Sequence, residues 1–321
     1  MSTYPWPALI VTVALVLAPT MALAQGGESV GMITEIKVGK GRVEVKAAGK
    51  PDVRPVGPFL ALRAGDSVRA TDNAFAVILL TGGRGTVKVE ASNSPYVAAA
   101  GAAGDSKLQK AQTLLAGSVG FLGASAGEPP KAVLSVRGAA RPSVILSPRD
   151  TPVLPGPLTF EWMGTQFARY TVRVSAPSGL VLEKKGVVGS RFEYPSDAPA
   201  LKSGVRYTLV VEPATGVPQQ TSFEVLDGNR ADTIRQNLKE LAAALGPNVP
   251  TNTAVAIRTG TLAREGLLHD ARQVVMAALA KDPDEPSLHT LLAQIYQKSG
   301  LPEQAAESFD EAQFLLTKGA N

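Results

Sequence analysis

Residues Leu292–Phe309 have the sequence LAQIYQKSGLPEQAAESF, in which apolar side chains recur at helical spacing on both sides of Gly300. The same pattern occurs 34 residues earlier: when residues 252–285 are laid over residues 286–319, Gly266 falls on Gly300. Helical patterns that repeat at such a period and turn at a glycine indicate helical hairpins that stack side by side. The C-terminal part of the chain is therefore predicted to be an all-α repeat array.

The two copies resemble the tetratricopeptide repeat, which has small residues where its helices cross, a glycine turn and a proline at its end, here Pro283. The second copy is close to the consensus of that family, whereas the first has Arg258-Thr259 where Leu-Gly is favoured. Four further pairs match at the same offset: Ala271 with Ala305, Val275 with Phe309, Ala278 with Ala312 and Leu262 with Tyr296. The resemblance implies a tetratricopeptide-like domain over residues 229–321.

In the tetratricopeptide family the inner face of each first helix holds the ligand, so the resemblance implies a groove here. The matching positions are Thr253, Ala256, Gly260 and Ala263 in the first copy and Ser287, Thr290, Gln294 and Gln297 in the second. Only the second set offers hydroxyl and amide groups that pair with a peptide backbone. These four residues are therefore predicted to bind a protein partner. The alternative is that two repeats only cap the chain or dimerise it, because so short an array lacks a full groove.

Two repeats need a cap, since about three are required for a stable stack. Residues 231–245 are the candidate cap, with a possible N-cap at Asn229 and Gly246-Pro247 at the end. One helical stripe there is apolar: Ile234, Leu238, Leu241 and Leu245. At the other end, residues 314–316 (Phe-Leu-Leu) cannot all face one side of a helix. A further docking surface for this last helix is expected, on another subunit or on the preceding domain, and a homo-oligomer through it is one candidate.

The middle region, residues 142–228, contains short alternating strands separated by Pro and Gly about every dozen residues, which is typical of a sandwich. The strand patterns lie at residues 143–148, 158–162, 170–174, 180–183, 207–211 and 221–225. The run from Phe160 to Val174 and the approach to Tyr207 resemble a fibronectin type III or immunoglobulin-like domain. The resemblance implies that Tyr207 is the corner tyrosine, with its hydroxyl bonded back to upstream backbone.

The front region, residues 25–141, also shows short strands with glycine punctuation. A glycine turn, the step Gly65-Asp66, a Thr71-Asp72 turn and the strand of residues 74–80 follow in an order that resembles the periplasmic FecR-type domain. The resemblance implies the domain only, not the signalling role of that family. Asp105 is predicted to cap a short helix that runs through residue 116 and is stopped by Gly117, with strands returning at residues 118–122 and 132–136. The Ala/Gly tract at residues 98–104 is predicted to be a surface excursion.

Residues 1–24 have no charged side chain, an apolar run at residues 8–18 and small residues at Ala22 and Ala24, which is typical of a secretory signal peptide. An uncleaved anchor is the alternative. The chain has no Cys, so disulfides and thiolate chemistry are excluded. We therefore expect a periplasmic or secreted protein. The overall fold class expected is multidomain, with a β-rich N-terminal domain and a β-sandwich before the all-α repeats.

Few residues in the sequence have the type and spacing that catalysis, metal binding or ligand binding requires. The turn at residues 82–85 lacks the Lys-Ser/Thr of a phosphate loop, so a hairpin is favoured. His269 and His289 are expected to be packing or surface residues, because no metal or catalytic spacing accompanies them. The acidic segment at residues 281–286 lacks the spacing of a calcium loop and is expected to be a solvated linker. Trp162 and Tyr170 are expected in a sandwich core rather than in a sugar-binding platform.

No catalytic, cofactor-binding or metal-binding residue is predicted, and the scattered basic residues of the front region do not indicate nucleic-acid binding. The sequence favours an exported, non-enzymatic adaptor or scaffold of the bacterial cell envelope that binds a protein partner through its helical repeats. The alternative is a cell-wall protein that binds peptidoglycan or another polysaccharide through its N-terminal β domains.

Overall fold

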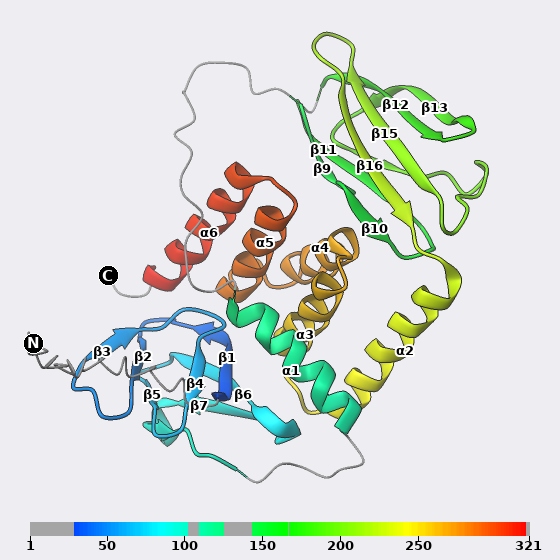
Figure 1. Cartoon of the computed structure of the whole chain (residues 1–321). Coiled ribbons are helices and arrows are strands. Elements are labelled where there is room, and N and C mark those ends of the chain that lie inside the picture. The colour runs from blue at the N-terminus through cyan, green and yellow to red at the C-terminus, as the bar shows by residue number, and fades with distance from the viewer. Residues whose placement is uncertain (1–28, 102–108, 125–142, 166, 319–321) are drawn as a thin grey trace, which may run out of the picture.

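The computed structural model describes residues 29–101, 109–124, 143–165 and 167–318 (Figure 1). It shows a β-rich N-terminal region, a β-sandwich and a C-terminal helical region, which confirms the predicted fold class. Four of the expectations above fall outside the described residues: the signal peptide at 1–24, the helix cap at Asp105, the strand at 132–136 and the end of the Ala/Gly tract. Within the described ranges, no helix has both the length and the apolar character that a membrane span requires.

The N-terminal β region consists of two four-stranded sheets, in the orders β4-β1-β6-β7 and β3-β2-β5-β8. The strands are β1 (Ser29–Lys37), β2 (Val43–Lys46), β3 (Val53–Pro55), β4 (Ala61–Arg63), β5 (Ser67–Ala70), β6 (Phe75–Leu80), β7 (Thr86–Glu90) and β8 (Tyr96–Val97). Ile33, Val68 and Ile78 are buried between the sheets. The Asp66 carboxylate accepts hydrogen bonds from the N–H groups of Ala48 and Arg63, at 2.9 and 2.8 Å, so the Gly-Asp step closes a loop between strands.

The sandwich pairs a five-stranded sheet, β10-β16-β15-β12-β13, with a three-stranded sheet, β14-β11-β9. The strands are β9 (Val144–Ser147), β10 (Thr151–Val153), β11 (Thr159–Met163), β12 (Arg169–Ala176), β13 (Gly179–Val188), β14 (Arg191–Glu193), β15 (Arg206–Pro213) and β16 (Gln219–Val225). All six predicted strand patterns coincide with strands. The Tyr207 hydroxyl accepts a hydrogen bond from the backbone N–H of Lys202 at 2.7 Å, so the upstream bond predicted for this tyrosine is confirmed.

The C-terminal helices are α2 (Gly228–Leu245), α3 (Thr251–Arg264), α4 (Leu268–Leu279), α5 (Pro286–Lys298) and α6 (Pro302–Thr317). Helices α3 and α4 form one hairpin, and α5 and α6 form the next, as the repeat predicts. Gly266 and Gly300 adopt positive φ values of 81° and 69° at the turns, a conformation that L side chains rarely adopt. Helix α2 begins as predicted, but Asp227 is its N-cap and accepts the N–H of Arg230 at 3.0 Å, so the Asn229 cap is wrong by two residues.

One element differs in type from its prediction. Helix α1 (Gln109–Ala124) continues through Gly117 and through residues 118–122, which were expected to be a strand. Tertiary contacts explain the difference, because the Ser118 hydroxyl bonds to that of Thr261 on α3 at 2.7 Å and Leu122 is fully buried. The Arg264 side chain lies over Gly117, where a Cβ atom would come within 1.7 Å of a guanidinium nitrogen, so this glycine sits inside the helix at a contact with α3 rather than at the helix end.

Helix α1 therefore packs against α3 although it belongs to the front third of the sequence (Figure 1). It covers α3 more extensively than α2 does, so the cap expected from residues 231–245 comes mainly from α1. We call α1 together with α3–α6 the helical array. The array lies between the two β regions: β1 contacts α3 and α5, while β10 of the sandwich contacts α4.

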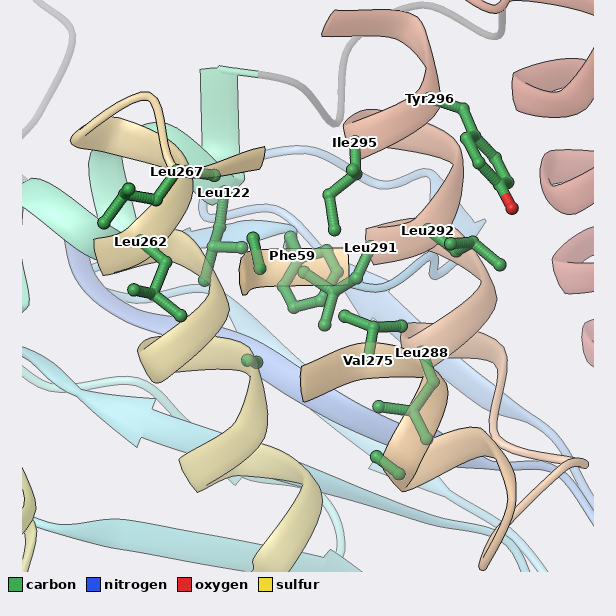
Figure 2. Close-up of a cluster of buried hydrophobic side chains, with 14 of the residues drawn as sticks. Phe59, Leu122, Leu262, Leu267, Val275, Leu288, Leu291, Leu292, Ile295 and Tyr296 are labelled. Atoms are coloured by element: carbon green, nitrogen blue, oxygen red, sulfur yellow. The ribbon is translucent and has the colours of Figure 1, made fainter. Parts of the chain in front are cut away.

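The hydrophobic core of the array includes side chains from the N-terminal β region. Phe59, in the loop between β3 and β4, is fully buried among the helices near Val275 and Leu291 (Figure 2). Its φ of 65° is unusual for a residue with a side chain, and its N–H donates to the carbonyl of Ile33 at 2.8 Å. The loop is thus held in a strained conformation that directs an aromatic ring into a neighbouring region.

Candidate functional site

The candidate site is the repeat groove, which we define as the face of α3 and α5 that carries the predicted partner-binding positions. Thr253, Ala256, Gly260 and Ala263 on α3 and Ser287, Thr290 and Gln294 on α5 are all buried, whereas Gln297 is exposed. In the structure the groove holds other parts of the same chain, namely β1 and the end of α1.

Strand β1 binds at the start of α3. The Glu35 carboxylate accepts hydrogen bonds from the backbone N–H of Thr253 at 2.6 Å and from its hydroxyl at 2.7 Å. The Thr34 hydroxyl lies 2.8 Å from the same hydroxyl oxygen. Pro250, the N-cap residue of α3, provides no side-chain cap. Glu35 therefore satisfies an otherwise unpaired N–H group and places a negative charge at the positive end of the helix.

The start of α5 makes a second contact with β1. Glu285 is the N-cap of α5, is only 1% exposed, and accepts hydrogen bonds from the hydroxyl and N–H of Ser287. The same carboxylate accepts the backbone N–H of Ile36 at 3.4 Å. The pKa of Glu285 is raised to about 7, mainly by burial and also by the nearby charge of Glu35, which together outweigh the lowering effect of the hydrogen bonds from Ser287 and Ile36.

A third contact lies at the rim of the groove. The Lys37 ammonium binds the Asp282 carboxylate at 3.0 Å, and the Asn252 amide donates to the same carboxylate at 2.9 Å. Partial burial lowers the pKa of Lys37, but its hydrogen bond and charge interaction with Asp282 outweigh that effect and raise it. Asp282 and Glu285 both belong to the segment expected to be a solvated linker. That expectation is wrong for Glu285, which is buried in the contact with β1.

The remaining groove residues are satisfied locally or by α1. The Thr290 hydroxyl donates to the carbonyl of Pro286 at 2.9 Å. The Gln294 amide donates to the carbonyl of Leu122 at 3.4 Å, while its side-chain oxygen is buried without a hydrogen-bond partner. Three of the four residues predicted to bind a partner therefore contact this chain's own helix ends or α1. Gln297 lies outside these contacts, on the exposed C-terminal end of α5.

The opposite side of the array is bound to the sandwich. The Arg272 guanidinium on α4 forms a buried ion pair with Glu161 of β11 and a 3.2 Å hydrogen bond to the hydroxyl of Tyr296. His269 is buried, as expected for a packing residue, and its Nδ1 lies 2.8 Å from the hydroxyl of Ser147. Burial lowers the pKa of His269 to about 4, so the ring is neutral near pH 7. Helix α4 therefore contacts the sandwich through an ion pair and a hydrogen bond.

Other sequence candidates resolve as follows. Trp162 and Tyr170 are buried with their rings 5.2 Å apart, which confirms the core interpretation. His289 is half-buried, with Nε2 2.7 Å from the carbonyl of Pro283. The glycine turn after β6 joins two antiparallel strands, as expected for a hairpin. In the part of the chain that the structure describes, no three His, Asp or Glu side chains gather in a way that could hold a metal ion.

No protein-family model matches this chain, and no curated protein matches its sequence. Two sides of the array contact other parts of this chain. Strand β1 lies in the groove at the N-termini of α3 and α5, and the sandwich lies against α4. Sequence reasoning missed the roles of Glu35 and Glu285, and it predicted only the first part of α1 and not its packing against α3. The sequence held one signal for the role of Glu285, namely the acidic pair Asp284-Glu285 before Pro286. Proline is common at the first position of a helix, and an acidic side chain is favourable at a helix N-terminus.

Proposed function

We propose that the protein is an exported, non-enzymatic adaptor of the bacterial cell envelope whose helical array binds a protein partner. The observation that supports this most is that two sides of the array hold other segments of this chain. Thr253 and Glu285 bind β1 in the groove, and Arg272 on α4 binds the sandwich. Helical arrays of this kind act by stacking and presenting surfaces rather than by chemistry. The apolar, uncharged residues 1–24 support export.

Among the described residues, the most exposed large apolar side chain of the array lies on α6. Phe314 is 55% exposed there, whereas Leu315 is buried and Leu316 packs against the N-terminal β core. The three apolar residues at the chain's end thus face different sides, as their spacing predicts. Asp310 and Glu311 are exposed close to Phe314 along the helix. The Lys318 ammonium lies 6.0 Å from the centroid of the Phe314 ring, so the patch offers a partner an exposed aromatic side chain among charges of both signs.

The test is capture of a partner from envelope extract by the immobilised full chain, with bound proteins identified by mass. Phe314→Ser is the test variant. Met276→Ser is the matched control, because Met276 is another partly exposed apolar residue on an array helix, α4. We expect one protein to be retained by the wild type and by Met276→Ser and to be lost from Phe314→Ser. Equal capture by all three chains, or retention only on purified peptidoglycan, would contradict the proposal.

A further inference from the structure

The turn between β6 and β7, the first half of α1 and the C-terminal end of α2 come together beside the N-terminal β region (Figure 1). A cavity of about 240 Å³ lies between these three segments. Its inner wall is apolar and buried and is formed by Leu79, Leu115 and Leu241. Gly83 and Asn248 also line it and are exposed, so the cavity opens to solvent. All the residues that line it belong to the part of the chain that the structure describes.

Small residues keep this cavity open. Gly83 and Gly85 adopt φ values of 72° and 84°, which side chains rarely tolerate, so the turn carries no side chain at these two positions. A Cβ atom at Gly85 would lie in open space. On the helices, the lining residues include Ala111 of α1 and Ala244 of α2. Because protein interiors hold few voids larger than a water molecule, a cavity of this size is a candidate ligand site.

The cavity carries one positive charge. Arg84 is the only charged residue among those that line it, and Arg84 is half-buried. Its guanidinium donates to three backbone carbonyls, at 3.0, 3.3 and 3.0 Å, which uses three of its five N–H donors. No ion pair among the described residues involves Arg84. The neighbouring charges on the two helices, Lys110 and Glu240, neutralise each other at 2.8 Å.

We propose that this cavity binds an apolar monocarboxylic acid, with its hydrocarbon part against the buried leucines and its carboxylate at Arg84. A guanidinium binds a carboxylate through charge-assisted hydrogen bonds, which are stronger than those to neutral groups. A cavity of about 150 Å³ holds benzene, so this larger one has room for a ligand of about ten non-hydrogen atoms. A lipid with two acyl chains is too large for it. The inference does not rest on the adaptor role, because the cavity and α6 lie in different parts of the chain.

A bound acid would contact the β6–β7 turn, α1 and α2 together. It would therefore stabilise the junction between the N-terminal β region and the helices, since a ligand that binds only the folded chain favours that state. A ligand of about ten non-hydrogen atoms is expected to bind with a Kd of about 0.1–1 mM.

The test is titration of the full chain with octanoate and with 1-octanol at pH 7.5, followed by saturation-transfer NMR. The two probes have similar hydrocarbon chains and differ mainly in charge, because the carboxyl group is ionised at this pH. The cavity-filling variant is Ala244→Phe, because Ala244 lines the cavity and is half-buried on α2. The matched control is Ala243→Phe, because Ala243 is exposed on the same helix and does not line the cavity.

We expect the wild type and Ala243→Phe to bind octanoate equally well, and to bind 1-octanol at least about tenfold more weakly. Ala244→Phe is expected to lose at least about tenfold in affinity for octanoate, because the ring fills the cavity. Arg84→Gln is expected to weaken octanoate binding to the level of 1-octanol and to leave 1-octanol binding unchanged, which separates a lost charge from a lost fold.

The proposal is overturned if the wild type does not bind octanoate at concentrations up to about 10 mM, well above the expected Kd. It is also overturned if 1-octanol binds the wild type as tightly as octanoate does, or if Ala244→Phe binds octanoate like the wild type. Phe314→Ser is expected to bind octanoate like the wild type, so this inference and the proposed function can fail separately.

Discussion

Glu35 of β1 caps helix α3 from outside the helical array: its carboxylate accepts both the N–H and the hydroxyl of Thr253, at 2.6 and 2.7 Å. The N-cap residue of α3 is Pro250, which has no side-chain acceptor to offer. A residue 218 positions earlier in the chain therefore completes the helix. The N-terminal β region is thus joined to the array by a cap that α3 does not supply itself.

Removing this cap should destabilise the protein. Glu35→Ala leaves the buried N–H and hydroxyl of Thr253 without their charged acceptor, and we expect the free energy of unfolding to fall by about 2–3 kcal/mol. Urea denaturation followed by circular dichroism measures the change. Glu44→Ala is the control, because Glu44 on β2 makes only a 3.6 Å ion pair with a largely exposed arginine, Arg42, and should change stability by less than about 1 kcal/mol. Equal effects of the two variants would show that Glu35 has no capping role.

The contact between β1 and α5 should weaken as pH rises. The pKa of Glu285 is raised in the folded state to about 7 from an ordinary value of 4.5, so between these values the folded state binds the proton more tightly. Its stabilising effect is therefore complete below about pH 4.5 and is lost as pH rises through 7. The charged groups that interact with it are Glu35 and Lys37 on β1, and Lys37 also interacts with Asp282 and Asp284 in the loop before α5.

Glu285→Gln removes this titration, so the difference in urea midpoint between the variant and the wild type, measured from pH 4 to 8, isolates it. The comparison is needed because Asp270, with a pKa raised to about 6 by burial, acts in the same direction, while His269, with a pKa lowered to about 4, acts in the opposite one. We expect the variant to gain stability relative to the wild type as pH rises. A difference that stays constant across this range would contradict the assignment.

Phe59 should couple the unfolding of the β region to that of the array. Phe59→Ala empties a fully buried position among the helices, and we expect a loss of about 3–5 kcal/mol. Val97→Ala, at an exposed position of the same β region, should cost less than about 0.5 kcal/mol. Hydrogen exchange followed by mass spectrometry should show reduced protection in α3 and α5 as well as in β1. Reduced protection confined to the β region would mean that the two parts unfold independently.

The ion pair between Arg272 and Glu161 should behave as a buried pair. Arg272→Met leaves the Glu161 carboxylate without its partner and should cost about 3–5 kcal/mol. Adding Glu161→Gln should restore a substantial part of the loss, because no uncompensated charge then remains. Thermal unfolding of the two single variants and the double variant gives the coupling directly. Additive losses would show that the pair contributes nothing to the junction with the sandwich.

Features that depend on neighbouring residues were predicted correctly from sequence. The glycines of both hairpin turns, the strands of the sandwich and the bond of the Tyr207 hydroxyl all follow from short-range spacing. The errors arose where a distant segment decides the outcome. Residues 118–122 have a strand-like pattern alone but form part of a helix because α3 covers them. Glu285 appears solvated in sequence, and only the position of β1 shows that it is buried.

The position of Leu316 against the N-terminal β core has a consequence for biosynthesis. A ribosome releases β1, Phe59 and α1 long before the residues that cover them, since these belong to the last third of the chain. The apolar side chains of these early segments therefore stay exposed to solvent until α6 has been synthesised. A chaperone that covers these segments during synthesis or export would therefore have its strongest effect on about the first hundred residues. A truncated chain without α6 would leave β1 exposed and would be degraded more readily.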